Sequence, residues 1–309
     1  MRYDALVPLV GILLMLACAL DALAQDIRGV VDLHVHSDPD SVPRSIDAID
    51  IAKLARKRGI RGVLLKNHYE STAALAYAVR KQVPGIEVFG GIALNRSVGG
   101  INPEAVDRMA RQKGRFGKVV WMPTFDAENH VKVSAENRPH VPITSAGALL
   151  PQVLEVLDLI ARNDLVLATG HSSPDQTLLL LAEARKRGIR RLLVTHPMMI
   201  PVSMDVSAMK KAAELGAKLE FVYNALIGPS KAFEPRDYAA AIRAVGPEHC
   251  ILSSDLGQAG NPLHPEGFQS FLRVLAAEGI SIQELETMSK TNPAHLLGLE
   301  VSRPTTGKP

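Results

Sequence analysis

The chain has 309 residues, of which 47% are hydrophobic, 22% charged and 4% aromatic, and its formal net charge is +3. This composition excludes disordered and collagen-like proteins. Since no basic block or aromatic-rich tract is present, no nucleic-acid partner is expected either. The two cysteines, Cys18 and Cys250, provide no disulfide framework. We therefore expect a globular protein whose partners are small molecules.

Residues 1–24 are predicted to form a signal peptide. Residues 5–20 carry no charge but are fewer than the roughly 20 that a membrane-spanning helix needs. Ala22-Leu23-Ala24 then supplies the small-x-small pattern that a signal peptidase reads. We expect cleavage after Ala24 and a bacterial periplasmic or secreted location, without stable membrane insertion. The alternatives are an uncleaved anchor and lipidation at Cys18, although residues 15–18 match a lipoprotein box poorly.

Residues 25–309 are predicted to form one domain of the α/β class. Eight short apolar runs alternate with amphipathic stretches, the pattern of a parallel sheet with its connections packed outside. These runs are residues 30–35, 62–66, 86–93, 118–123, 165–169, 191–195, 218–223 and 250–254. Eight such units predict a (β/α)8 TIM barrel whose active site lies at the carboxyl ends of the strands.

Helix signals separate these runs. Asn102 and Ser173 each precede a proline and an acid, which predicts two N-caps, and Ser281 with Glu284 predicts a capping box. The heptapeptide Ala-Arg-Lys-Arg-Gly-Ile-Arg occurs twice, at residues 55–61 and 184–190. Basic side chains suit the end of a helix and glycine suits the left-handed residue after it, so the repeat indicates a helix terminus rather than a functional basic motif.

Residues 126–146 show no convincing helix or strand. Unstructured loops of this length are usually functional or disordered. The segment contains His130 and His140 and follows the fourth predicted strand. We expect it to cover a substrate.

The first predicted strand carries Asp32, His34 and His36. The strand period of two places these three on one face, with Leu33 and Val35 on the other. Buried neutral imidazoles need partners, and a divalent metal ion satisfies two at once. We predict that His34 and His36 ligate a metal and that Asp32 orients them without ligating.

Three further strand ends carry residues of the same kind. His171 follows the fifth strand, His196 the sixth and Asp255 the eighth. Like His36, these residues lie at the carboxyl end of a barrel strand, so we expect all of them to meet at one metal site. A satisfied core or loop histidine is the alternative for each imidazole, and a helix N-cap is the alternative for Asp255.

This set of residues resembles the amidohydrolase superfamily. The resemblance lies in His-x-His on strand one, histidines ending strands five and six, and aspartate ending strand eight. Residues 292–299 also resemble the closing helix of that superfamily, while residues 65–68, 121–124 and 168–171 resemble an uncharacterised bacterial branch. The resemblance implies a metal-dependent hydrolase in which a metal-activated water attacks an amide, lactone or other ester bond, with Asp255 as both ligand and general base.

The fourth strand departs from that pattern. Many two-metal members bridge the ions there with a carbamylated lysine or a glutamate, but Trp121-Met122-Pro123-Thr124 offers neither. On strand two, Lys66 and His68 share a face, and we predict that Lys66 is a metal ligand as a bridging carbamate. Alternatively Lys66 ligates as a neutral amine, is a snorkelling lysine or binds a substrate carboxylate, with His68 as the next candidate ligand. Glu220, on strand seven, is expected to support the site without ligating.

Histidine-rich ligation with an open position favours zinc, as one or two ions, with manganese or iron as alternatives. Trp121, Phe125, His130 and Tyr223 are predicted to line the pocket. A polymerase-and-histidinol-phosphatase (PHP) type phosphoesterase is a rival, but its late Asp-x-His motif is Asp255-Leu256-Gly257 here. A metal-dependent decarboxylase on the same barrel and a non-catalytic metal or solute binder also fit these residues. The sequence does not identify the substrate.

Overall fold

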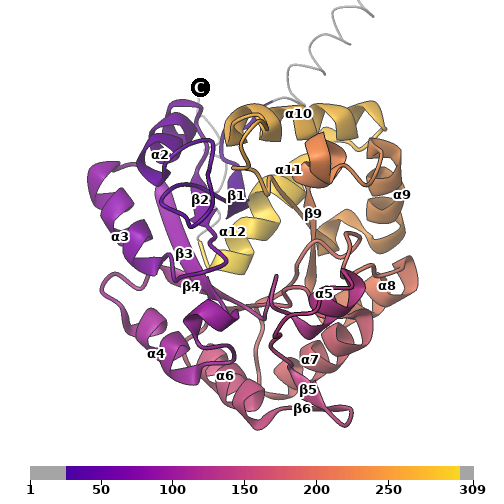
Figure 1. The fold of residues 1–309 in the computed structure, drawn as a ribbon. Coiled ribbons are helices and arrows are strands. Elements are labelled where there is room, and N and C mark those ends of the chain that lie inside the picture. Colours follow the sequence, from indigo (N-terminus) through magenta and orange to yellow (C-terminus); the bar gives the residue numbers. More distant parts are fainter. Residues whose placement is uncertain (1–25, 300–309) are drawn as a thin grey trace, which may run out of the picture.

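A computed structural model describes residues 26–299 and confirms the predicted (β/α)8 barrel (Figure 1). Eight parallel strands pair in chain order, and a bridge between Val35 and Leu256 brings the last strand back to the first. Each predicted run overlaps a strand, and the bounds of run and strand differ by at most two residues. The strands are β1 (Val31–Val35), β2 (Gly62–Leu65), β3 (Glu87–Ala93), β4 (Gly117–Trp121), β7 (Val166–Ala168), β8 (Leu192–Val194), β9 (Lys218–Val222) and β10 (Cys250–Ser253).

Helices surround the ring of strands, and α10 packs back against α2, so the outer layer also closes (Figure 1). The α-helices are α2 (Ala48–Lys57), α3 (Ala73–Gln82), α4 (Pro103–Arg111), α5 (Glu128–Val133), α6 (Pro151–Arg162), α7 (Pro174–Lys186), α8 (Val206–Glu214), α9 (Pro235–Val245), α10 (His264–Ala277), α11 (Ile282–Glu286) and α12 (Asn292–Leu297). Within residues 26–299, none of the helices has the length and apolarity that crossing a membrane requires.

The predicted helix ends are confirmed. Asn102 caps α4, and Ser173 and Ser281 form capping boxes at α7 and α11. Such caps each stabilise a helix by about 1 kcal/mol. Both copies of the basic heptapeptide end a helix, and their glycines, Gly59 and Gly188, adopt the left-handed conformation expected after a helix.

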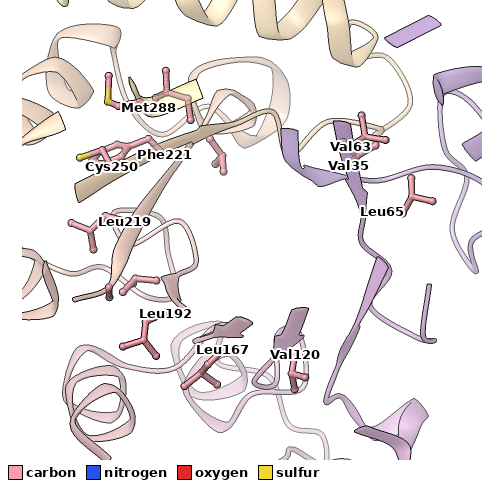
Figure 2. Packing of buried hydrophobic residues seen from close by; sticks show 14 of the residues in the cluster. Val35, Val63, Leu65, Val120, Leu167, Leu192, Leu219, Phe221, Cys250 and Met288 are labelled. Atoms are coloured by element: carbon pink, nitrogen blue, oxygen red, sulfur yellow. The ribbon is translucent and has the colours of Figure 1, made fainter. Parts of the chain in front are cut away.

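Two layers of apolar side chains hold the barrel together. The outer layer lies between strands and helices, and Figure 2 shows its members around the ring of strands, among them Val120, Leu167 and Leu192. The inner layer includes Leu33 and Trp121 and is joined by side chains of α12. The interior is therefore packed, and the open space lies at the carboxyl ends of the strands.

The side-chain alternation predicted for the first strand is wrong at one point. Leu33 belongs to the inner layer and Val35 to the outer layer, so they do not share a face. The cause is a shift in the pairing of β1 with β2 between Asp32 and Val35. Irregularities of this kind re-aim side chains near active sites, and here His34 and His36 still reach one cavity.

The prediction that residues 126–146 lack regular structure is also wrong. The segment contains α5, stabilised by a 2.6 Å ion pair between Glu128 and Lys132 and by burial of Val131, and it contributes β5 (Thr144–Ser145) to a hairpin with β6 (Ala148–Leu149). One six-residue helix is too short for hydrophobic periodicity to reveal. The predicted signal peptide, its cleavage after Ala24 and the alternative lipidation at Cys18 all lie outside the described residues.

Candidate metal centre

A cavity of about 430 Å³ opens at the carboxyl ends of the strands. All six residues predicted to bind metal line it. They are His34, His36, Lys66, His171, His196 and Asp255. His68, Phe125 and His130 line the same cavity, as the sequence suggested, whereas His140 lines a separate one. Trp121 and Tyr223 are not among its lining residues. Trp121 lies beneath Lys66, and Tyr223 packs on Phe271.

The tightest part of the site is formed by His34, His36 and Asp255. The Nε2 atoms of the two histidines lie 3.0 and 3.1 Å from Oδ1 of Asp255. Within the described residues, these three form the compact group of side chains able to hold one metal ion. Lys66 Nζ lies 2.9 Å from His34 Nε2 and so belongs to the same centre. We call His34, His36 and Asp255 the compact group, and Lys66 lies directly beside it.

His171 and His196 lie further along the cavity wall. The rings of His34 and His196 are 6.2 Å apart between centroids, and those of His196 and His171 are 5.0 Å apart. His130 continues the row, because its Nδ1 lies 2.9 Å from His171 Nδ1 and the rings stack. The structure thus brings the predicted residues into one cavity, with His171, His196 and His130 as a separate outer group.

Glu220 fixes which ring nitrogen of His34 carries the hydrogen. Its Oε2 lies 3.3 Å from His34 Nδ1, and an ionised carboxylate only accepts hydrogen bonds, so Nδ1 carries the hydrogen. In the neutral ring, Nε2 then presents a lone pair to Asp255 Oδ1, only 3.0 Å away. Two acceptors at that distance need a cation or a second proton between them.

The donor set fits a divalent ion. Bonds of about 2.0–2.1 Å in a tetrahedral zinc site place neighbouring ligand atoms about 3.3 Å apart, close to the Nε2 to Oδ1 separations of the compact group. A carboxylate that orients the far nitrogen of a ligating histidine is the usual support of such a site, and Glu220 occupies that place. The residues present therefore suit a metal with nitrogen and oxygen ligands.

Charge in the compact group is arranged for a cation. Burial would raise the pKa of Asp255, but His34 and His36 hold it well below its usual range. Burial would lower the pKa of His34, yet the carboxylates of Asp255 and Glu220 outweigh it and raise this pKa to about 9. Without a metal, the two carboxylates thus keep a proton on the ring between them. A metal ion placed there would satisfy the same carboxylates.

The other histidines are held neutral, which is the form that ligates metal. Burial lowers the pKa of His36 to about 3 and that of His196 to about 4. Burial also takes the pKa of His171 and His68 well below the ordinary value. The ring of His68 stacks on that of His36 with centroids 5.0 Å apart, and its Nδ1 lies 2.8 Å from Thr124 Oγ1.

Asp32 acts through the backbone. Its Oδ1 accepts hydrogen bonds from the backbone N–H of Ser254 at 2.9 Å and of His34 at 3.2 Å. Burial raises its pKa to about 6. Asp32 therefore ties the end of β10 to β1 and fixes Asp255 relative to His34, and no hydrogen bond joins it to an imidazole ring among the described residues.

Two predicted ligands occupy strained backbone. His196 and Asp255 have φ angles of 26° and 51°, in the left-handed region that side chains other than glycine rarely adopt. Such strain gathers at functional sites. Next to His171, Gly170 has a φ of 60°, and a Cβ there would lie 2.2 Å from the carbonyl oxygen of Met122. Only glycine lets β7 pass this close to β4 and present His171 to the cavity.

Sequence reasoning missed Arg44, Asn224 and Gln258, which also line the cavity. Asn224 Nδ2 lies 3.5 Å from Asp255 Oδ2. The sequence could have indicated Asn224, because this residue directly follows the seventh predicted strand, just as the predicted ligands follow their strands. Arg44 and Gln258 lie in loops, where position in the sequence gave no such signal.

Comparison with known proteins gives the fold and the family. A structure of an amidohydrolase from Pseudomonas aeruginosa matches with a TM-score of 0.62 and 12% identity, covering 89% of this chain and 97% of that one. A phosphotriesterase (PTE)-like lactonase variant from Deinococcus radiodurans gives a TM-score of 0.60 and 15% identity over 89% and 97%. The phosphotriesterase homology protein from Escherichia coli, complexed with phosphate, gives 0.57 and 18% over 87% and 99%.

These structures confirm the predicted resemblance to amidohydrolases at the level of the fold. A search of curated proteins found no match. The model of a protein family matches residues 29–220, which include β1 to β8 and every predicted ligand except Asp255. The chain therefore belongs to DUF6282, a family of unknown function.

Proposed function

We propose that this protein is a metal-dependent hydrolase that cleaves an amide, lactone or other ester bond of a small molecule. The observation that carries the proposal is the pairing of His34 Nε2 with Asp255 Oδ1 at 3.0 Å, with Glu220 holding the hydrogen on the other ring nitrogen. The likeness to structures described as an amidohydrolase and a lactonase supports the class of reaction.

His34, His36 and Asp255 would hold the metal, and His171 and His196 would complete its ligands or hold a second ion. When bound, a divalent ion lowers the pKa of water from 15.7 towards about 7 and polarises the substrate carbonyl. Zinc suits this donor set, and manganese and iron are the alternatives.

Asp255 takes the proton of the attacking water. Its carboxyl group is ionised at neutral pH, because the neighbouring histidines hold its pKa well below the usual range. Oδ1 faces the two histidines, so the proton goes to Oδ2, beside Asn224. From there it passes to the leaving group, as general acid and base catalysis requires of one well-placed carboxylate.

Lys66 is proposed to carry a carbamate. Burial lowers the pKa of its amine to about 8, so about a tenth is neutral at pH 7, the form that reacts with carbon dioxide. The reaction joins the amine to carbon dioxide and releases one proton. The resulting negative charge would let Lys66 link the compact group to the outer group, which an ammonium would oppose.

The test uses residues 25–309, stripped of metal by a chelator and then loaded with zinc or manganese. We expect metal-dependent turnover in an amide, lactone or ester library, with no turnover by a His34→Ala, His36→Ala double variant. His140→Ala is the matched control, since His140 lines another cavity. Turnover of phosphoesters alone, release of carbon dioxide from carboxylates, or tight metal binding without turnover would each overturn the proposal.

We also propose that the protein is exported. The support is the uncharged stretch at residues 5–20 followed by Ala22-Leu23-Ala24. The N-terminal mass of protein recovered from the cell envelope should begin at Gln25. An intact Met1 on protein in the cytoplasmic fraction would contradict export.

A further inference from the structure

Arg44 lies in the cavity wall and is held there by its backbone. It forms an antiparallel bridge with Gln258, whose side-chain amide donates to the Asp255 carbonyl oxygen at 2.9 Å. The neighbouring Ser45 N–H donates to the Gly257 carbonyl oxygen at 2.9 Å. The loop between β1 and α2 is thereby fixed to the loop after β10. Arg44 thus stands at a defined position in the wall of the cavity that also holds Asp255.

One edge of the Arg44 guanidinium is occupied and the other is available. Nε and Nη2 lie 2.7 and 2.6 Å from Asp40 Oδ2. The Arg44 side chain is 7% exposed and that of Asp40 is completely buried. Within residues 26–299, Nη1 makes no hydrogen bond. Asp40 therefore holds the guanidinium still, and Nη1, with its two N–H donors, has no partner among the described residues.

Three exposed apolar side chains line the same cavity. Val42, Phe125 and Ile200 line it and are 37%, 39% and 70% exposed. Cavities that bind small molecules are lined largely by apolar side chains with a few well-placed polar groups, so these three side chains suit an apolar part of a ligand. The cavity thus combines exposed apolar side chains with a fixed, buried cation in its wall.

We propose that Arg44 binds a carboxylate of the substrate while Val42, Phe125 and Ile200 hold an apolar arm. This inference rests on the proposed hydrolase function, because that function is what makes the bound carboxylate a substrate. Of the two lysine and arginine side chains that line the cavity, Lys66 is engaged with His34, so Arg44 is the one able to receive an anion. Because the Arg44 and Asp40 pair is neutral overall, it suits a singly charged carboxylate better than a doubly charged phosphate. Guanidinium N–H groups match carboxylate oxygens in geometry.

The test is calorimetric binding of 4-phenylbutyrate, its uncharged amide 4-phenylbutyramide, and butyrate to the zinc-loaded protein. We expect 4-phenylbutyrate to bind at least tenfold more tightly than either of the others. An Asp40→Asn, Arg44→Gln double variant removes both charges and avoids a buried unpaired carboxylate. In that variant the preference for carboxylate over amide should disappear, and Arg44→Lys should keep part of it. A Glu104→Gln, Arg108→Gln variant of an exposed ion pair on α4 is the matched control.

The inference is overturned if the amide binds as tightly as the carboxylate, or if the preference survives in the double variant, as it would if the metal alone bound the carboxylate. It is also overturned if phenyl phosphate binds more tightly than 4-phenylbutyrate. Failure of the two proposals is distinguishable. Arg44-dependent selectivity without turnover of any library compound would refute the hydrolase and leave the carboxylate site. Turnover without Arg44-dependent selectivity would refute only this inference.

Discussion

The two groups of histidines in the cavity differ in how they are supported. In the compact group, carboxylates flank the His34 ring on both sides, with Asp255 at Nε2 and Glu220 at Nδ1. In the outer group, the neighbour of His171 is another histidine, His130, and Nδ1 of His196 has no partner among the described residues. The compact group therefore contains ionised side chains, whereas the outer group consists of neutral imidazoles.

This difference indicates an order of metal binding. The compact group offers negative charge and ligand atoms already within 4.8 Å of one another, so it should bind the first ion tightly. The outer group offers imidazoles alone and needs a further anion to hold a cation. A carbamate on Lys66 would provide that anion, since Lys66 lies beside the compact group in the same cavity.

The largest effect is expected from breaking the compact group. Replacing His34 and His36 with alanine should remove the metal and lower kcat/KM by more than about 10³-fold, because a metal Lewis acid contributes several kcal/mol to the transition state. Elemental analysis should then find less than one ion per chain. Full metal occupancy in this variant would show that the compact group is not the tight site.

A smaller loss is expected when Lys66 becomes alanine. The outer group should then lose its ion while the compact group keeps one, and most activity should disappear. An excess of bicarbonate or of a short carboxylate should partly restore the second ion and the activity, because each of these compounds supplies the missing anion. Two ions bound with unchanged affinity would instead make Lys66 a structural or substrate residue and His68 the next candidate ligand.

The sequence predicted the residues at strand ends well, for a physical reason. In a parallel barrel all strands end at one face, so His171, His196 and Asp255 needed only correct strand positions to be placed in one cavity. It did not predict the irregular pairing that separates Leu33 from Val35, because alternation assumes a regular strand. Nor did it predict Arg44, whose place depends on pairing with residues more than 200 positions away. Loop paths of that kind are not encoded locally.

Within the outer group, His130 is expected to orient His171, because their Nδ1 atoms lie 2.9 Å apart. His130→Ala should weaken metal binding at the outer group by about 10–100-fold, the range typical for loss of a residue that orients a ligand. His130→Gln should recover part of this affinity, because its amide can still bond to His171 Nδ1. His140→Ala, in the same segment but outside the cavity, is the control. Equal metal affinity in all three variants would assign His130 to substrate contact alone.

The smallest effect concerns the metal-free protein, whose stability should depend on pH differently through the two groups. The folded pKa of His34 is about 9, above its ordinary 6.5. Its contribution to stability is therefore complete below pH 6.5 and is lost as pH rises towards 9. The folded pKa of His196 is about 4, so its contribution is complete above pH 6.5 and is lost as pH falls towards 4.

We expect His34→Gln to flatten the alkaline side of a plot of Tm against pH, and His196→Gln to flatten the acidic side, in chelator-treated protein. If both variants altered the same side, the two groups would not differ in charge, and the proposed order of metal binding would lose its electrostatic basis.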